Sequence, residues 1–194
     1  MKALRRCLAV CFALAALSIP AWAGGNANFV LGWRGLDEDY WSPVENQAVV
    51  GVTVDFGKEG WPVFLEAGLQ GSAGDDNVLD IGDVSVTGSV GELSFGVNKT
   101  WQPAGNIRPF IGGGLASVTA TYEVDTFLGD VDDDDTSLGV YLHGGVFWRL
   151  GKRFNIGVDG RIMVGTDITL FGAEGDADYA QLGLVLGWGW PAGK

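Results

Sequence analysis

Cysteine is scarce in this sequence, and both copies lie near its start. The 194 residues contain only Cys7 and Cys11, so the chain beyond them has no disulfide bond to stabilise it. Long apolar runs are also missing. After the first 23 residues, no stretch approaches the roughly 20 continuous apolar residues that a membrane-spanning helix needs. The sequence therefore predicts neither a disulfide scaffold nor a helical membrane protein.

Basic residues are few as well. The chain has 12 Lys and Arg residues against 24 Asp and Glu residues, which gives a formal net charge of −12. An excess of negative charge repels phosphate backbones, so we expect no nucleic-acid partner. His143 is the only histidine, and we expect it to be a packed or hydrogen-bonded residue rather than a catalytic one.

The N-terminal segment is typical of a secretory signal peptide. Lys2, Arg5 and Arg6 form a basic start, an almost wholly apolar run covers residues 7–17, and Ala21-Trp22-Ala23 is a small-x-small cleavage site. We therefore predict a signal peptide over 1–23 and one domain over 24–194. A single spanning helix is the alternative, but the apolar run is too short for it. Lipidation of Cys11 is disfavoured, because a small residue would be wanted where Val10 stands.

Glycine is abundant, at 32 of 194 residues. Interior glycines destabilise helices by about 0.5–1 kcal/mol each relative to alanine, whereas curved sheets and narrow lumens use them. Helical periodicity is correspondingly weak, and alternation with a period of two residues recurs instead. Eight segments show it, at about 26–36, 47–56, 62–72, 84–100, 107–122, 138–150, 154–167 and 178–190.

Two of these segments change phase. The apolar positions shift between Val90 and Leu93, and again between Leu115 and Val118. A β-bulge would re-aim the apolar face in this way. Alternatively, those ends project beyond the bilayer, where alternation is no longer enforced.

The two faces of the segments differ sharply. One is apolar and uncharged, and the other carries glycine, polar and charged residues. The second face makes a poor hydrophobic core, so we expect it to line a narrow polar lumen while the apolar face meets lipid. Backbone groups in lipid must all be bonded, so the sheet has to close. The predicted fold is all-β, an eight-stranded antiparallel up-and-down transmembrane β-barrel. A soluble barrel that binds a ligand is the alternative.

Aromatic residues and connections agree with a membrane barrel. The connections after the second, fourth and sixth segments are short, and the others are long, as in periplasmic turns and extracellular loops. The long connections contain 19 of the 24 acidic residues and no Lys or Arg. We expect interface aromatics near the short turns, and these are Trp61, Trp101, Trp148, Phe154, Trp188 and Trp190.

Two stretches resemble a known family. Residues 108–115, Arg-Pro-Phe-Ile-Gly-Gly-Gly-Leu, resemble a strand of small outer-membrane barrels of the opacity and outer-membrane-protein-A type. Residues 144–161 resemble the penultimate hairpin of these barrels. The last strand of the family usually ends at an aromatic, whereas here Trp190 is followed by Pro191-Ala192-Gly193-Lys194. The resemblance implies a monomer in the outer membrane of a Gram-negative bacterium. The alternation of short and long connections predicts that both termini are periplasmic. The partners that the resemblance implies are lipid, lipopolysaccharide and the barrel-assembly machinery.

Charged residues on the lumen face form the main candidate site. Charges inside a small barrel must pair or stay wet. The resemblance implies a salt-bridged plug, or a very narrow water path that would act as an ion gate. A gate predicts that replacing Glu66 or Glu92 with alanine alters single-channel conductance. With Asp55 as a further candidate, the predicted network comprises Arg34, Glu66, Glu92, His143, Arg149, Asp159 and Arg161.

Catalysis and metal binding have weaker signals. In membrane-barrel deacylases a serine follows the histidine by two residues, but Gly145 stands there, so we expect no enzyme. An EF-hand loop counted from Asp130 would need glycine and glutamate where Asp135 and Tyr141 stand. No cofactor is expected. Two interpretations are open for the acidic run: a loose divalent-cation site that bridges to lipopolysaccharide phosphates, or a solvated acidic loop tip. The run comprises Asp130, Asp132, Asp133, Asp134 and Asp135.

These observations predict an integral outer-membrane protein with a structural or surface-antigen role, acidic extracellular loops and a polar plugged lumen. The alternative function is a narrow channel for ions or small apolar solutes.

Overall fold

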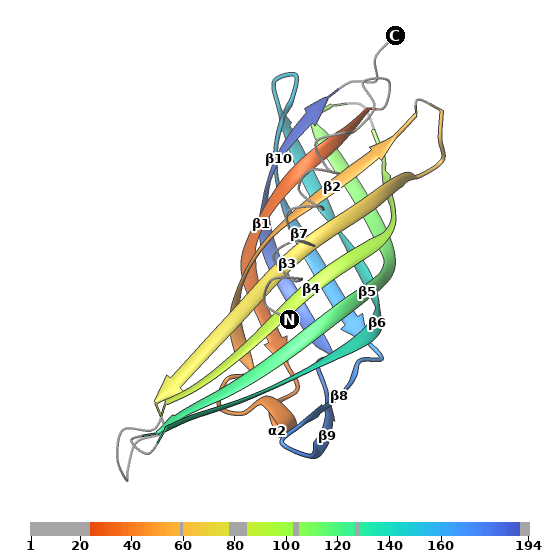
Figure 1. The fold of residues 1–194 in the computed structure, drawn as a ribbon. Helices are drawn as coiled ribbons and strands as arrows, with labels where there is room; N and C mark the ends of the chain where they lie inside the picture. Colours follow the sequence, from red (N-terminus) through yellow and green to blue (C-terminus); the bar gives the residue numbers. More distant parts are fainter. Residues whose placement is uncertain (1–23, 59, 78–84, 103–104, 127–128, 191–194) are drawn as a thin grey trace.

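The computed structural model describes residues 24–58, 60–77, 85–102, 105–126 and 129–190. The predicted signal peptide lies outside these residues. Eight long strands close into one antiparallel barrel in the order β1-β10-β7-β6-β5-β4-β3-β2 (Figure 1). Their bounds are β1 Gly24–Leu36, β2 Asn46–Gly57, β3 Phe64–Asn77, β4 Ser85–Thr100, β5 Ile107–Thr126, β6 Gly129–Leu150, β7 Phe154–Val164 and β10 Tyr179–Trp190.

Each strand pairs with its neighbours, and the first and last strands close the barrel. β1 and β10 pair antiparallel from Gly25 opposite Trp190 to Leu36 opposite Tyr179. Closure leaves no strand edge whose amides would be unpaired in lipid. The predicted eight-stranded antiparallel barrel is therefore confirmed, with the segment at 154–167 shortened to β7.

Three small elements lie at one end of the barrel. They are the helix α2 (Glu38–Trp41) and the hairpin of β8 (Asp167–Leu170) with β9 (Ala173–Asp176). We call this end, where the long connections lie, the loop end. The opposite end, where β2–β3, β4–β5 and β6–β7 are joined and where Gly24 and Trp190 lie, is the turn end. Among the described residues, no helix is long and apolar enough to span a membrane.

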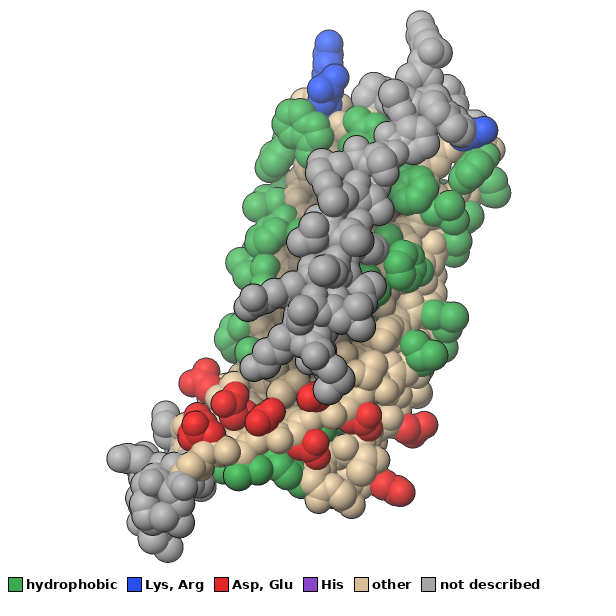
Figure 2. Space-filling view, in the orientation of Figure 1, with side chains coloured by type: hydrophobic (Ala, Val, Ile, Leu, Met, Phe, Trp, Pro, Cys, Tyr) green, Lys and Arg blue, Asp and Glu red, His purple; other side chains and the backbone are tan. Residues whose placement is uncertain are grey.

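The outer face of the barrel is apolar along its body. Leu31, Leu142 and Leu182 are 55, 50 and 68% exposed, although leucine is normally buried. Inward positions on the same strands hold Arg34, His143 and Gln181, which are almost completely buried. Figure 2 shows apolar side chains along the body, acidic ones gathered at the loop end and basic ones at the turn end. The inversion predicted from the sequence is thus the observed arrangement.

The bulges considered for the two phase shifts are not present in the described strands. β4 and β5 pair without interruption from Ser85 opposite Asp125 to Thr100 opposite Phe110. The interior changes instead. Near the loop end Val90 and Val118 point inward and are buried, whereas Leu93 further along β4 faces outward. The apolar side therefore switches because the loop end has its own hydrophobic interior beyond the lipid-facing belt.

The acidic stretch after the fifth segment is strand rather than a loop tip. Asp130 to Asp135 lie within β6 and pair with β5, with Asp132 opposite Glu123 and Asp130 opposite Asp125. The sequence-based expectation of a long loop over residues 123–137 was therefore wrong. The strand propensities of the individual residues do not indicate this extension. The hairpin is stabilised instead by cross-strand hydrogen bonds and by the flanking threonines.

Candidate functional site

The lumen consists of three layers along the barrel axis. An apolar cluster fills the loop end, hydrogen-bonded charges fill the middle, and an open vestibule occupies the turn end. A small second cluster of Val30, Phe110, Phe147 and Val185 separates the middle from the vestibule. In that second cluster, Phe110 stacks on Phe147 with ring centroids 4.3 Å apart.

The first group of charges in the middle layer centres on Glu92. Arg34 Nη2 lies 3.2 Å from Glu92 Oε2, and Arg161 Nη2 contacts Glu92 Oε1. Tyr179 donates its hydroxyl to the same carboxylate. Two arginines on one buried carboxylate leave an excess positive charge, which the ring of Tyr179 offsets at 3.7 Å from Arg34 Cζ. All four side chains are thus mutually constrained.

Neutral side chains complete the shell around Arg34. Gln181 Oε1 accepts from Arg34 Nε and Nη2 at 3.2 and 3.0 Å, and Ser72 Oγ accepts from Nη1 at 3.3 Å. Ser72 donates in turn to Gln47 at 2.6 Å. Every nitrogen of the Arg34 guanidinium therefore has an acceptor, as a fully buried cation requires.

The second group of charges centres on His143. Its Nδ1 lies 3.1 Å from Asp159 Oδ2, and its Nε2 lies 3.1 Å from Glu66 Oε1. Asn98 donates to Glu66 at 2.9 Å, and Tyr141 donates to it at 3.2 Å. Tyr141 also connects the two groups, because Arg161 Cζ lies 3.8 Å above its ring. The result is one continuous network that crosses the lumen.

Inward glycines make room for these rings. A Cβ on Gly112 would collide with the imidazole of His143, and one on Gly96 would come within 2.5 Å of the Tyr141 hydroxyl. The glycine abundance of the sequence thus has a local cause in a lumen that holds large side chains.

Six of the seven predicted lumen residues meet in this network. Arg149 does not. It lies near the end of β6, on the vestibule side of Phe147, and lines the vestibule. Alternation assigned it to the correct face but gave no depth along the axis. Asp55, the further candidate, is buried and accepts from Asn26 at 2.9 Å.

Sequence reasoning missed the uncharged members of the network. They include Gln47, Gln70, Ser72, Asn98, Tyr141, Tyr179 and Gln181. All occupy inward positions of their strands. The alternation of inward and outward positions along each strand was therefore an available signal.

The loop end is closed by a cap of two segments. Trp41 from α2 is fully buried and donates its indole N–H to Asp176 O at 2.8 Å. Tyr40 donates to Ala173 O at 3.0 Å and accepts from Leu170 N at 3.1 Å. α2 and the β8–β9 hairpin are thereby fixed to each other above the charged network.

The acidic residues of β6 support the same cap. Asp135 accepts from Thr169 N at 2.8 Å, and Asp133 accepts from Phe171 N at 2.6 Å. Successive side chains of a strand point to opposite faces, so the five aspartates do not converge on one point. Among the described residues, no group of three or more His, Cys, Asp or Glu side chains is placed to hold a metal ion. Loose cation binding here stays a prediction.

Electrostatics at the cap are those of crowded carboxylates. Partial burial raises the pKa of Asp176 above its ordinary value. The neighbouring charges of Asp178, Asp37 and Asp167 act in the same direction, and a hydrogen bond from Asp178 N opposes them. Asp167 lies directly opposite Asp176 in the β8–β9 hairpin.

The predicted interface aromatics all lie at the turn end. Trp61, Trp101, Trp148, Phe154 and Trp188 are between 38 and 53% exposed, and Trp190 is half-buried. At the other end of β1, Trp33 is 62% exposed and was not singled out from the sequence. A contact of these rings with lipid head groups remains a prediction.

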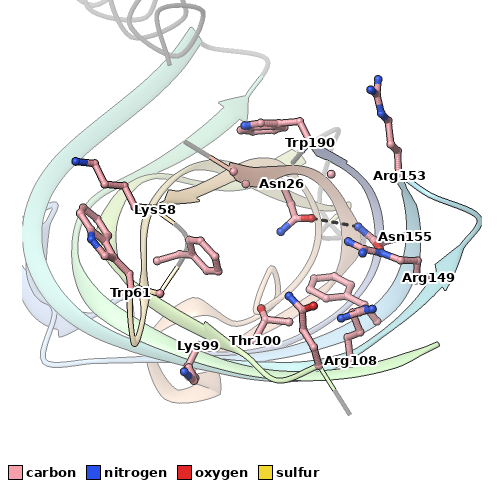
Figure 3. Close-up of a pocket in the computed structure, with 18 of the residues that line it drawn as sticks. Asn26, Lys58, Trp61, Lys99, Thr100, Arg108, Arg149, Arg153, Asn155 and Trp190 are labelled. Carbon is pink, nitrogen blue, oxygen red and sulfur yellow. Dashed lines mark hydrogen bonds between the residues drawn. The ribbon is translucent and has the colours of Figure 1, made fainter. Parts of the chain in front are cut away.

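The vestibule at the turn end has a volume of about 700 Å³. Its lining includes six basic residues and, among the described residues, no acidic one (Figure 3). The six are Lys58, Lys99, Arg108, Arg149, Lys152 and Arg153.

Comparison with known proteins identifies the fold and the family. The sequence matches the outer membrane protein β-barrel domain family over residues 7–189. The structure is similar to Ail, the attachment invasion locus protein of Yersinia pestis, with a TM-score of 0.58 and 8% identity over 87% of this chain and 97% of that one. Neisserial surface protein A is similar with a TM-score of 0.52 and 11% identity over 86 and 96%. Comparison with curated protein sequences gave no match. Since the family match covers almost the whole chain, this protein belongs to the outer membrane protein β-barrel domain family.

Proposed function

We propose that this protein is a sealed outer-membrane barrel with a structural or surface-antigen role. The observation that carries the proposal is the continuous filling of the lumen. The apolar cap around Trp41, the network around Glu92 and His143, and the stacked Phe110 and Phe147 follow one another along the axis. The middle layer leaves a cavity of only about 20 Å³, which has room for about one water molecule.

The narrow channel is the less favoured function. Ion passage would require rupture of the Arg34–Glu92–Arg161 contacts and displacement of the two aromatic rings below them. Buried, mutually satisfied charges resist this, because each broken contact leaves an uncompensated charge in a low dielectric. The network is therefore proposed as a plug rather than as a gate.

We propose that the loop end faces the cell exterior and the turn end the periplasm. Support comes from the long connections and acidic residues at the loop end and from the basic residues at the turn end. We propose that the acidic loops contact lipopolysaccharide phosphates through divalent cations. The Ail structure contains a heparin analogue, sucrose octasulfate. A polyanion of that kind is not proposed as a ligand of the loop end here, because the long connections have no Lys or Arg.

Two measurements test the proposal. Refolded protein should migrate differently on gels before and after boiling, as a closed barrel does. In planar bilayers it should give no discrete conductance steps. Steps of reproducible size in the unaltered protein, with a size that changes in the Glu92→Gln variant, would instead support the channel. Absence of a boiling-dependent shift would contradict the barrel itself.

A further inference from the structure

The vestibule at the turn end has the composition of a ligand pocket. Its volume of about 700 Å³ lies within the range of about 300–1,000 Å³ typical of small-molecule sites. It is a blind cup, because the stacked rings of Phe110 and Phe147 close its floor. The charged network and the aromatic rings fill the lumen without using this space. The cup is therefore not part of the plug.

Two arginines stand at its inner wall. Arg108 on β5 and Arg149 on β6 come from neighbouring strands and both line the cavity. Phe147 is the cross-strand partner of Arg108, and Asn155 is that of Arg149. In Figure 3 the two arginines lie on one side of the opening with Asn155, while Asn26 faces them and Arg153 points away.

Neither arginine has a counter-charge among the described residues. Both Nε and Nη1 of Arg108 and Nε of Arg149 are buried without a hydrogen-bond partner. The two guanidinium groups also interact with each other as like charges. The buried carboxylate of Asp55 is bound by Asn26 and Asn28 instead. Uncompensated cations in a partly desolvated cup are costly unless something else pairs with them.

The chemistry of the cup favours a multiply charged oxyanion. Guanidinium groups present planar forks of donors that match phosphate oxygens, and two such forks on neighbouring strands match an anion that carries more than one charge. Lys99, Lys152 and the other basic residues of the rim add a positive field that draws anions toward the opening. Asn155 donates its Nδ2 to Asn26 at 3.3 Å, so the cations and not the neighbouring amides would hold the anion.

We propose that the turn-end vestibule is a binding site for a phosphate-bearing anion, held between Arg108 and Arg149. The site is separate from the plugged middle of the lumen and does not depend on whether the plug opens. The phosphate can belong to a soluble solute or to a phospholipid head group at the membrane surface. Both present the same oxygens to the two arginines.

Pyrophosphate titration by calorimetry tests the site on the full chain, refolded in a nonionic detergent that contains no phosphate. We expect saturable binding. The double variant Arg108→Gln/Arg149→Gln should weaken it at least about tenfold, and Arg108→Lys/Arg149→Lys, which keeps the charge but loses the forks, should weaken it by about the same factor. Boiled and unboiled gel migration identifies variants that fail to fold.

The matched control removes the same charge from exposed positions of the rim, with Lys152→Gln/Arg153→Gln. The affinity of this control variant for pyrophosphate should be less than about threefold below that of the unaltered protein, because exposed charges act through a screened field. Equal losses in the control and the Arg108/Arg149 variants would overturn a built site and leave non-specific attraction. Absence of saturable binding to the unaltered protein would overturn the proposal outright.

A competition experiment distinguishes the two sources of phosphate. Short-chain phosphatidylglycerol, added below its micellar concentration, should displace pyrophosphate from the unaltered protein if a lipid head group occupies the cup. Failure to compete at any concentration up to that limit would assign the cup to soluble phosphates. Either result retains the site and names its ligand.

Discussion

At the residue scale, Glu92 is the side chain on which most of the buried charge depends. It is 2% exposed and contacts two arginines and a tyrosine hydroxyl. Arg34 and Arg161 would have no other carboxylate contact among the described residues if it were removed. A carboxylate that contacts two buried guanidinium groups has more effect on stability than any single ion pair on the surface.

Replacement of Glu92 by alanine is therefore expected to lower the free energy of unfolding by about 3–5 kcal/mol, because it leaves two buried cations unpaired. Urea unfolding of the protein folded into lipid vesicles measures this. Glu174→Ala, at an exposed position of β9, is the control and should change stability by less than about 0.5 kcal/mol. Similar values for both variants would mean that the network does not contribute to stability.

At the element scale, α2 and the β8–β9 hairpin act as one cap although about 130 residues separate them in sequence. The apolar residues of the cap, among them Trp41, Ile168 and Leu170, pack in one cluster with inward residues at the loop end of the barrel strands. This cluster resembles the interior of a soluble protein, in contrast to the polar middle of the barrel. Such a cap can open locally while the strands below it stay paired.

Trp41→Ala should therefore loosen the cap without unfolding the barrel. Loss of a buried tryptophan costs about 3–5 kcal/mol, so amide exchange in β8 and β9 should accelerate at least about a hundredfold. Hydrogen exchange followed by mass spectrometry measures it, with β1 and β10 as internal references. Trp33→Ala, on the outer face, should leave β8 and β9 unchanged. Equal acceleration throughout the barrel would contradict an independent cap.

At the scale of the whole molecule, charge is sorted along the barrel axis. Acidic side chains lie at the loop end and basic ones at the turn end (Figure 2). The apolar belt between them limits how the barrel can sit in a membrane. The proposed orientation, with the loop end facing the cell exterior, has a direct test.

Single cysteines are clean probes here, because the chain beyond residue 23 contains none. On intact cells, a membrane-impermeant maleimide should label Glu174→Cys at the loop end. Lys152→Cys at the turn end should react only after the outer membrane is permeabilised. The reverse pattern would invert the proposed orientation. The same samples report on removal of the predicted signal peptide, because a retained Cys7 or Cys11 adds labelling sites to denatured protein.

The sequence by itself determined the barrel, because side chains on a strand alternate between two faces and only one face here suits lipid. It also determined which charges face the lumen, since parity assigns Arg34, Glu92 and Arg161 alike. It did not determine depth. Whether two inward residues meet depends on the register between strands far apart in sequence, which placed Arg149 in the vestibule.

Only the tertiary structure decided which side chains fill the loop end of the lumen and which line its turn end. Val90 and Val118 break the alternation of their strands because the cap above the lipid-facing belt needs an apolar interior. No local pattern reveals this, since the cap forms only when α2 meets the β8–β9 hairpin. The proximity of Arg108 and Arg149 was also decided by the tertiary structure. Both residues lie on an inward face, but only closure of the barrel brings two cations together in a cup that holds no carboxylate among its described residues.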